Sequence, residues 1–467
     1  MKTRRFFHTA VGLALGLAAV VPAVRADVKM PNIFGSHMVL QRNQADKVWG
    51  WADKGEEVTV TIADQTKKAK ADDKGAWSVM LDPMKGPGPF KMVVTGKNTI
   101  TFEDVLVGEV WICSGQSNMQ WAVQQSNDGD LEAMTAKFGR IRFISVPQVG
   151  TQTPQNDFNG KWEACNPNTV KQFSGVGYFF GRQLYQTLNV PIGLIDDAWG
   201  GSSCEAWVRR DILEKDPQYK PLIDRWVGME KAYEAEKAGD APKTAAKKKD
   251  GGGLAGQMSG NARPGNIYNG VLKPTIGYGI KGAIWYQGES NASRAYQYRE
   301  LFPLMIKSWR EEWGIGDFSF YWVQLADYLA EKPEPGDSSW AELREAQSLT
   351  QKLPNSGQAV IIDLGEARDI HPRNKQDVAM RLARLALAKD YGVKVPYMSP
   401  TFKSMEKKDG KIILTFDHVG DGGLYALRLR EISRDPMKFR MRGSGGICGS
   451  VESDHPPALS QKMCCYG

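Results

Sequence analysis

Between about residues 105 and 395, short apolar runs alternate with longer stretches that have a helical period. Residues 373–389, for example, repeat apolar side chains at Val378, Leu382 and Leu385, which share one face of a helix. The strand-length runs are almost continuously apolar, as is typical of buried parallel strands; they are Val107–Cys113, Pro191–Asp196, Gly282–Tyr286, Phe318–Leu325 and Gln358–Leu364. The alternation predicts an α/β domain in which helices cover both faces of a parallel sheet.

The segment from residue 27 to about 104 has a different rhythm. Short alternating runs such as Val58–Ile62 and Lys91–Val94 are separated by glycine, proline and aspartate. This pattern predicts a small, sandwich-like all-β domain. No titratable cluster with catalytic spacing occurs in it, so we expect a packing role, with sugar binding as the alternative.

Two further segments depart from the α/β pattern. Residues 230–262 are rich in Lys, Ala, Glu and Gly, with a charged and glycine-rich centre at Lys247–Gly253, and can bury little apolar surface. We expect a mobile surface insertion there. Residues 396–467 begin with a β-rich stretch, Lys411–Phe416, but from Ser433 on they are rich in Arg, Gly and Cys and show little periodicity.

Residues 1–26 have the features of an export signal. Basic residues precede a short apolar run, and Val24–Ala26 fits a small-residue cleavage site. The run is too short to span a bilayer, and no cysteine follows the cut, so we expect no membrane or lipid anchor. Thr3–Phe7 also resembles a twin-arginine signal. We therefore expect a secreted or periplasmic protein.

Composition narrows the range of partners. Removing the four positive side chains of the signal, with no acid among them, lowers the formal net charge from +7 to +3, which does not suggest a nucleic-acid or membrane-surface partner. The 14 tryptophans are a weak hint of sugar binding, because sugar rings stack on aromatic faces. None of the six cysteines has Cys-x-x-Cys spacing, so we expect no zinc or iron–sulfur site, and we expect Cys113 to be a buried free thiol.

Polar and glycine-rich loops follow several of the predicted strands, at the edge where ligands bind in open α/β sheets. Ser117 follows Val107–Cys113 in a strand-to-helix turn that would expose its hydroxyl beside free backbone N–H groups, although a serine there could also be an ordinary helix cap. Gly200 and Gly201 follow the next run and could bring backbone amides close to a bound oxygen.

The loop after Gly282–Tyr286 gathers polar side chains in a turn. Gln287 or Asn291 could donate a hydrogen bond to an oxyanion, and Glu289 could orient a histidine or anchor loops.

His371 follows the last predicted strand and is the only histidine between residues 38 and 417. A serine nucleophile needs a base, and imidazole titrates near neutral pH. Asp369 could fix its tautomer and support its charged form, as the acid of a Ser-His-Asp triad does.

Taken together, these segments resemble the sialate O-acetylesterase family of the SGNH-type hydrolases. The resemblance covers most of residues 30–395 and rests on an ordered set of motifs: Met38–Arg42, Val48–Ala52, Gly108–Trp111, Gly115–Met119, Trp199–Ser203, Glu205–Trp207, Tyr268–Gly270, Trp285–Asn291, Leu343–Gln347 and Asp369–Pro372. It implies an SGNH-like, flavodoxin-like three-layer sandwich for residues 105–395.

The resemblance also implies roles. Ser117 matches the nucleophile, His371 the general base and Asp369 the neighbouring carboxylate. Oxyanion donors would be Ser117 N–H, the Gly200–Gly201 turn and the Gln287–Asn291 loop. Because Asp-x-His is tighter than the usual Asp-x-x-His, Glu289 remains an alternative triad acid.

The implied activity is hydrolysis of acetyl esters on sugars, without a metal or organic cofactor. The substrate could be acetylated sialic acid, or acetylated xylan or another polysaccharide, because substrate choice depends on loops around a shared fold. An alternative of another class is a non-catalytic, secreted carbohydrate-binding protein. Unlike the family, the chain does not continue from Gly423-Leu424 into an aromatic-rich strand region.

Overall fold

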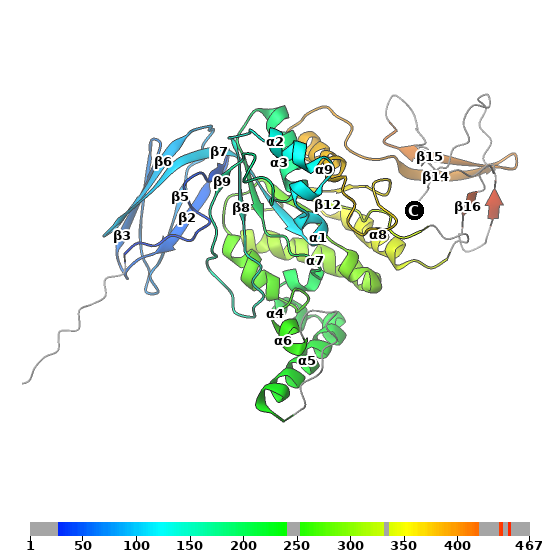
Figure 1. Ribbon diagram of the computed structural model, residues 1–467, viewed down its shortest axis with the longest axis horizontal. Helices are drawn as coiled ribbons and strands as arrows, with labels where there is room; N and C mark the ends of the chain where they lie inside the picture. The colour runs from blue at the N-terminus through cyan, green and yellow to red at the C-terminus, as the bar shows by residue number, and fades with distance from the viewer. Residues whose placement is uncertain (1–26, 241–252, 331–335, 420–438, 442–446, 450–467) are drawn as a thin grey trace, which may run out of the picture.

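The computed structural model describes residues 27–240, 253–330 and 336–419, together with the backbone of two short strands at 439–441 and 447–449. The predicted signal, the centre of the predicted insertion and most of the chain beyond residue 419 lie outside the described residues. Figure 1 shows a β domain at one end, an α/β domain in the middle and a β hairpin at the other end.

The α/β domain is built on a parallel sheet with strand order β13-β12-β11-β7-β10-β8, and the short β9 pairs antiparallel at the β8 edge. The strands are β7 (Thr99–Gly115), β8 (Ile141–Ser145), β9 (Glu163–Ala164), β10 (Ile192–Asp196), β11 (Gly282–Tyr286), β12 (Ser319–Val323) and β13 (Ser356–Ala359). The predicted parallel sheet is therefore confirmed. β8 was not predicted, because Arg142 interrupts its apolar run. In the structure this arginine is buried, and its Nη1 donates a hydrogen bond to Asp104.

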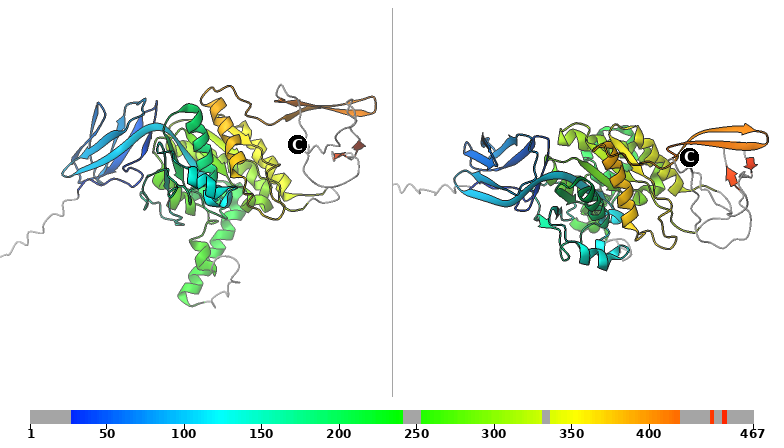
Figure 2. Two further views of the ribbon diagram at one scale, coloured as in Figure 1. Left: turned by 45° about the horizontal axis from the view of Figure 1, so that its top comes forward. Right: turned by 90° about the horizontal axis from the view of Figure 1, so that it is seen from above.

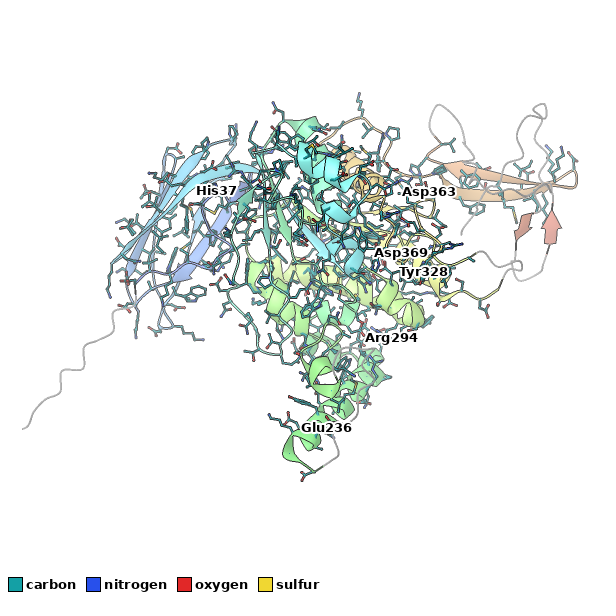
Figure 3. All side chains as sticks on the ribbon, viewed as in Figure 1. His37, Glu236, Arg294, Tyr328, Asp363 and Asp369 are labelled. Atoms are coloured by element: carbon teal, nitrogen blue, oxygen red, sulfur yellow. The ribbon has the colours of Figure 1, made fainter. Side chains whose placement is uncertain are left out.

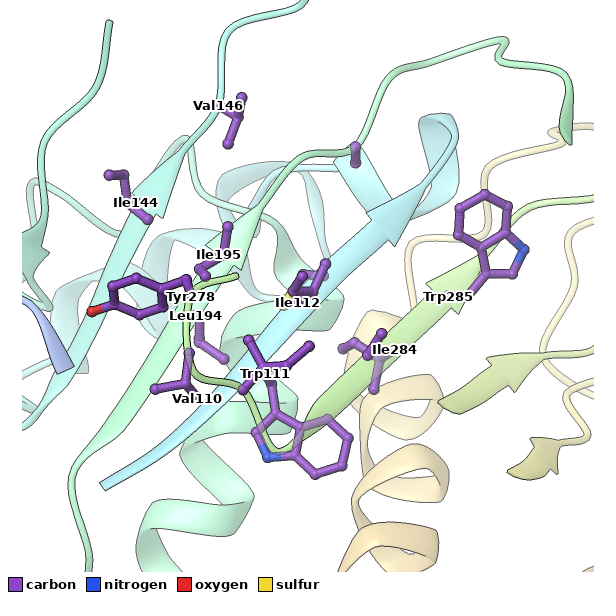
Figure 4. Packing of buried hydrophobic residues seen from close by; sticks show 14 of the residues in the cluster. Val110, Trp111, Ile112, Ile144, Val146, Leu194, Ile195, Tyr278, Ile284 and Trp285 are labelled. Carbon is purple, nitrogen blue, oxygen red and sulfur yellow. The ribbon is translucent and has the colours of Figure 1, made fainter. Parts of the chain in front are cut away.

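Helices cover both faces of the sheet, as predicted, and the strand register explains why. Trp111 of β7 pairs with Gly282, whereas Trp285 of β11 pairs with Ser114, so the two indoles point to opposite faces. Trp111 packs edge-on against Phe180 of helix α3 (Gly175–Leu188), and Trp285 packs against Phe302 of helix α7 (Ala295–Trp313). Figure 4 shows these apolar side chains on neighbouring strands.

The larger helices of this domain pack in two groups. α3 and α9 contact each other over β8, β10, β12 and β13, and α7 packs with α8 on the other side. The helices are α1 (Ser117–Gln120), α2 (Gly129–Thr135), α3 (Gly175–Leu188), α4 (Arg210–Lys215), α5 (Lys220–Ala238), α6 (Gly253–Met258), α7 (Ala295–Trp313), α8 (Ser339–Leu349) and α9 (Lys375–Lys389).

The first residues of the predicted insertion, 230–238, continue helix α5. Helix α6 lies in the last part of the insertion. Leu222 and Trp226 of α5 form a small apolar cluster with Met258 of α6. This helical pair projects away from the sheet in two views (Figures 1 and 2). Its helical structure was not predicted, because so few apolar side chains are needed to pair two surface helices.

The N-terminal domain consists of short strands whose side chains alternate between buried and exposed, as the alternating runs predicted. β3, β4, β6 and the first part of β7 form one sheet, and β2 pairs with β5 in another. Their bounds are β1 (Val39–Gln41), β2 (Asp46–Trp51), β3 (Glu57–Ile62), β4 (Gln65–Lys70), β5 (Ala76–Leu81) and β6 (Phe90–Thr95).

Strand β7 runs through both domains. Its first residues pair antiparallel with β6, and its last residues lie between β10 and β11 in the parallel sheet. The predicted boundary at residue 104 falls inside it. Asp104, near the point where β7 passes from one sheet to the other, has a positive φ of 56°. Its carboxylate bonds both Arg142 of β8 and His37, so side chains of both domains hold this part of the strand.

At the C-terminal side, β14 (Thr401–Lys408) and β15 (Lys411–Asp417) form an antiparallel hairpin that lies apart from the sheet (Figure 2). The predicted strand at Lys411–Phe416 corresponds to β15. The chain from Ser433 on, to which no fold was assigned, is described only as the backbone of β16 (Phe439–Met441) and β17 (Ile447–Gly449).

A buried carboxylate ties the two domains together. Glu109 of β7, which is 3 % exposed, accepts hydrogen bonds from Arg42 Nε, from Gln41 Nε2 at 3.0 Å and from Tyr391 Oη at 3.0 Å. Replacing Glu109 with alanine removes the acceptor of all three donors, and among the described residues only Gln41 Nε2 keeps another one, the Arg42 carbonyl at 3.2 Å. We expect Glu109→Ala to lower the free energy of unfolding by about 3 kcal/mol, measured by urea denaturation.

The matched control is Glu57→Ala, because Glu57 pairs with Lys68 on the exposed face of the β domain. This variant should unfold at the same urea concentration as the parent chain. Equal, small effects of the two substitutions would contradict a structural role for Glu109.

Candidate active site

Ser117 lies at the carboxyl edge of the sheet, in the turn between β7 and α1. Gly115 has a φ of 135°, and a Cβ there would come within 2.2 Å of the Tyr286 carbonyl oxygen, so only glycine fits. Gln116 N–H donates to the same carbonyl at 2.9 Å and locks the turn onto β11. Because α1 is a single turn, its dipole is small, and individual N–H groups are the relevant donors.

His371 reaches Ser117 from the other end of the chain. Its Nε2 lies 2.8 Å from Ser117 Oγ, within hydrogen-bonding distance. The imidazole is stacked on the Trp121 indole, with the ring centroids 5.0 Å apart and the planes inclined by 15°. The structure therefore brings together the two residues that the sequence predicted as nucleophile and base.

Asp369, which is labelled in Figure 3, is the carboxylate beside the imidazole. Its Oδ1 lies 3.4 Å from His371 Nδ1 and accepts the backbone N–H of His371 at 2.9 Å. A distance of 3.4 Å is long for a hydrogen bond, and Asp369 is half exposed, so its attraction to the imidazole is screened by water.

Glu289, the other candidate acid, has a different partner. Its Oε1 accepts a hydrogen bond from Asn118 Nδ2 at 2.6 Å. The imidazole itself contacts Ser117, Asp369 and Trp121. The geometry thus favours Asp369 as the carboxylate that faces Nδ1, with Nδ1 protonated and Nε2 free to accept the serine proton.

The Gly200–Gly201 turn lies next to the serine. A Cβ on Gly200 would lie 3.5 Å from Ser117 Cβ. Gly200 N–H donates to the side-chain oxygen of Gln120 at 2.7 Å, a distance at which a catalytic donor would hold an oxyanion. Gln120 is exposed, so a substrate carbonyl can take the place of its amide oxygen. Gly201 carries the next peptide of the turn, and its carbonyl accepts Ser290 Oγ at 3.0 Å.

Gln287 and Asn291 are not brought to the serine. Both side chains are completely buried. Gln287 Nε2 donates to Ser202 O at 3.0 Å and to Asn291 Oδ1 at 2.7 Å, and Asn291 Nδ2 donates to Glu205 at 2.9 Å. Both Nε2 hydrogens of Gln287 and one Nδ2 hydrogen of Asn291 are thus bonded inside the protein, so these side chains brace the loop after β11, and their role as oxyanion donors stays a prediction.

Sequence reasoning missed Gln120, Trp121, Asn118 and Lys375, which all contact the predicted residues or their loops. The burial of Lys375 could have been predicted from the spacing of the apolar residues in its helix. Lys375 is three residues before Val378 and seven before Leu382, so it shares the apolar face of α9 and is buried with them.

The predicted free thiol is also confirmed. Cys113, Cys165 and Cys204 are free and buried, and burial raises the pKa of the Cys113 thiol well above its ordinary value. Within the described ranges, no group of three or more His, Cys, Asp or Glu side chains could hold a metal ion. Among the helices of those ranges, none is both long enough and apolar enough to cross a bilayer.

A parallel sheet with a Ser–His pair at its carboxyl edge and a glycine turn beside the serine has the architecture of an SGNH-type esterase. The sequence model of one family, described as "carbohydrate esterase, sialic acid-specific acetylesterase", matches residues 107–238 and 258–387. The chain belongs to this family.

Named relatives agree with that assignment. The chain is 31 % identical to mouse sialate O-acetylesterase over 456 residues, which cover 86 % of this chain and 81 % of that one. It is 33 % identical to the human sialate O-acetylesterase over 432 residues, covering 82 % and 76 %. A solved carbohydrate acetylesterase from Xanthomonas citri is 35 % identical, with a TM-score of 0.74 and coverage of 91 % of this chain and 89 % of that one.

The environment of His371 predicts the pH dependence of activity. Partial burial lowers the pKa of His371 below its ordinary 6.5; Asp369 opposes this effect and Lys375 adds to it. A base must be unprotonated, so activity is retained above this pKa and lost as the pH falls through it. We expect the acid limb of kcat/KM to have its midpoint below pH 6.5.

The companion variant is Asp369→Asn. It removes the charge that raises the pKa of His371, so the midpoint should move to still lower pH. A parent midpoint above 6.5, or a shift to higher pH in the variant, would contradict this electrostatic description.

Proposed function

We propose that the protein is a carbohydrate O-acetylesterase in which Ser117 attacks the acetyl carbonyl and His371 is the general base. The observation that supports this most directly is the 2.8 Å contact between Ser117 Oγ and His371 Nε2. Ser117 lies beside a glycine turn whose Gly200 N–H, now bonded to Gln120, is available as a backbone donor. Family membership supplies the substrate class.

In the proposed reaction, Nε2 of His371 takes the proton of Ser117 as Oγ bonds to the acetyl carbon. The carbonyl oxygen becomes an oxyanion and is held by Gly200 N–H, after displacing Gln120, and by Ser117 N–H. The bond between the acetyl carbon and the sugar oxygen then breaks, and His371 gives its proton to that oxygen, so the sugar leaves as an alcohol and an acetyl-serine remains. Water, activated by the same imidazole, then releases acetate and regenerates Ser117.

Asp369 supports this cycle by facing Nδ1. It stabilises the imidazolium that forms when His371 takes the proton, and its bond to the His371 N–H fixes the loop. Since it is half exposed, we propose a supporting contribution rather than an essential one.

The proposed substrate is an acetylated sialic acid, as the names of the mouse and human relatives suggest. The similar Xanthomonas citri structure is described more broadly as a carbohydrate acetylesterase, which keeps acetylated xylan and other acetylated polysaccharides as the second candidate. The intact Ser–His contact argues against a purely sugar-binding protein.

Ser117→Ala tests the chemistry. It removes the nucleophile while leaving the fold intact, so acetate release should fall at least ~10³-fold. Release is measured from O-acetylated sialic acid and from acetylated xylan in parallel. We expect the parent chain to favour the sialate ester, and the variant to lose activity on whichever ester is cleaved.

The control is Ser78→Ala, an exposed serine of β5 in the N-terminal domain, which should be fully active. Retained activity in Ser117→Ala would refute the nucleophile. Binding of either sugar without acetate release by the parent chain would instead favour the non-catalytic alternative.

We also propose that the protein acts outside the cytoplasm, because residues 1–26 have the basic, apolar and small-residue regions of an export signal. Expression of the full chain in a bacterium should give a mature form that begins at Asp27, as determined by N-terminal sequencing of the exported fraction. A cytoplasmic product that retains Met1 would contradict this proposal.

A further inference from the structure

Lys375 is a completely buried lysine in the first turn of α9, four residues after His371. A buried ammonium group is costly unless specific partners compensate for its lost hydration. The reaction proposed above makes no use of it. Because its burial is costly and it lies next to the active site, we expect Lys375 to have a specific role there.

The partner of Lys375 is the residue next to the proposed nucleophile. Its Nζ donates to Asn118 Oδ1 at 2.6 Å. The ammonium also lies over two aromatic rings, 5.3 Å from the centroid of Tyr286 and 5.7 Å from that of Trp121, the ring that stacks on His371. Cations are attracted to such ring faces.

This contact decides how the Asn118 amide is oriented. An ammonium can only donate, so the amide atom that faces it must be the oxygen. The amide nitrogen then points the other way, where it donates to Glu289 Oε1 at 2.6 Å and to the Ile370 carbonyl at 3.0 Å. Both of those groups are acceptors, so the three contacts agree on a single orientation.

The Ile370 carbonyl belongs to the residue immediately before His371. Through it, Asn118 joins the nucleophile's turn to the loop that carries the base. Through Glu289, it also joins the loop after β11. Three segments that are remote in sequence are thus held together by one amide, and Lys375 sets the direction of that amide.

The positive charge of Lys375 also affects the pKa of His371. It contributes to the lowered pKa of His371, in addition to the effect of burial. Burial lowers the pKa of Lys375 itself to about 7, and the carboxylates of Glu289, Glu366 and Asp369 oppose that shift by favouring the charged form. Burial raises the pKa of Glu289, an effect that Asn118 and Lys375 oppose.

We propose that Lys375 is a positioning residue for the Ser117–His371 pair: it orients the Asn118 amide so that it holds the His371 loop, and it places a positive charge near the base. The proposal rests on the proposed function, because it assigns Lys375 an effect on that pair. Lys375 touches neither reacting atom, so its contribution passes through Asn118 and through the electrostatic field at the imidazole.

The test is Lys375→Met, which keeps the length of the side chain but removes its charge and its donor. Loss of the amide's anchor should misplace the base slightly, and kcat should fall roughly ten- to a hundredfold with little change in KM. Loss of the nearby charge should move the acid limb of kcat/KM to higher pH. This shift is opposite to the one expected for Asp369→Asn.

The matched control is Lys389→Met, at the other end of the same helix, where Nζ contacts the Ser356 carbonyl rather than the site. It should leave kcat and the acid limb unchanged. The double variant Lys375→Met/Glu289→Gln also removes the carboxylate charge that Lys375 helps to offset, so it separates loss of function from misfolding caused by an uncompensated Glu289. It should fold and show the same two kinetic changes.

Parent activity that requires Ser117, together with an unshifted acid limb in both Lys375 variants, would overturn this proposal and leave the proposed function intact. A fall in kcat no larger than that of Lys389→Met would overturn it too. Activity that survives Ser117→Ala would refute the proposed function instead, whatever Lys375→Met does.

Discussion

Strand β7 is hydrogen-bonded to β10 on one side and to β11 on the other, and this pairing positions the loops of the active site. It places the ends of three strands at one edge, so that Ser117, the Gly200 turn and the Glu289 loop follow strands that are hydrogen-bonded neighbours. The close approach of Gly115 to Tyr286 fixes the height of the serine above the sheet. Because β7 also pairs with β6, the same strand anchors the N-terminal domain.

The active-site loops are then joined by polar contacts rather than by the sheet. His371 follows the edge strand β13, and its imidazole is held by Ser117, Asp369 and the Trp121 ring. The buried Asn118 amide links the His371 loop to the Glu289 loop. Buried polar groups of this kind specify a single geometry because each unmade hydrogen bond would be costly.

Sequence patterns predicted the elements whose burial is uniform, such as β11, and the residues whose chemistry is distinctive, such as His371. They failed where a polar residue is buried by its partners. β8 was not predicted because Arg142 lies within it, and the burial of Lys375 on the apolar face of α9 was not recognised. The orientation of Gln287 and Asn291 was also beyond the sequence, because an amide after a strand can face the substrate or brace its own loop. Only their contacts decide which.

Covalent labelling can show whether Ser117 is a nucleophile that His371 activates. The folded protein would be treated with a fluorophosphonate, which reacts with activated serine hydroxyls, and digested for peptide mass spectrometry. We expect one adduct, on Ser117, which forms in step with the loss of esterase activity and is absent from a His371→Ala variant. Inactivation with an adduct on a different residue, or equally fast labelling of Ser117 without His371, would contradict it.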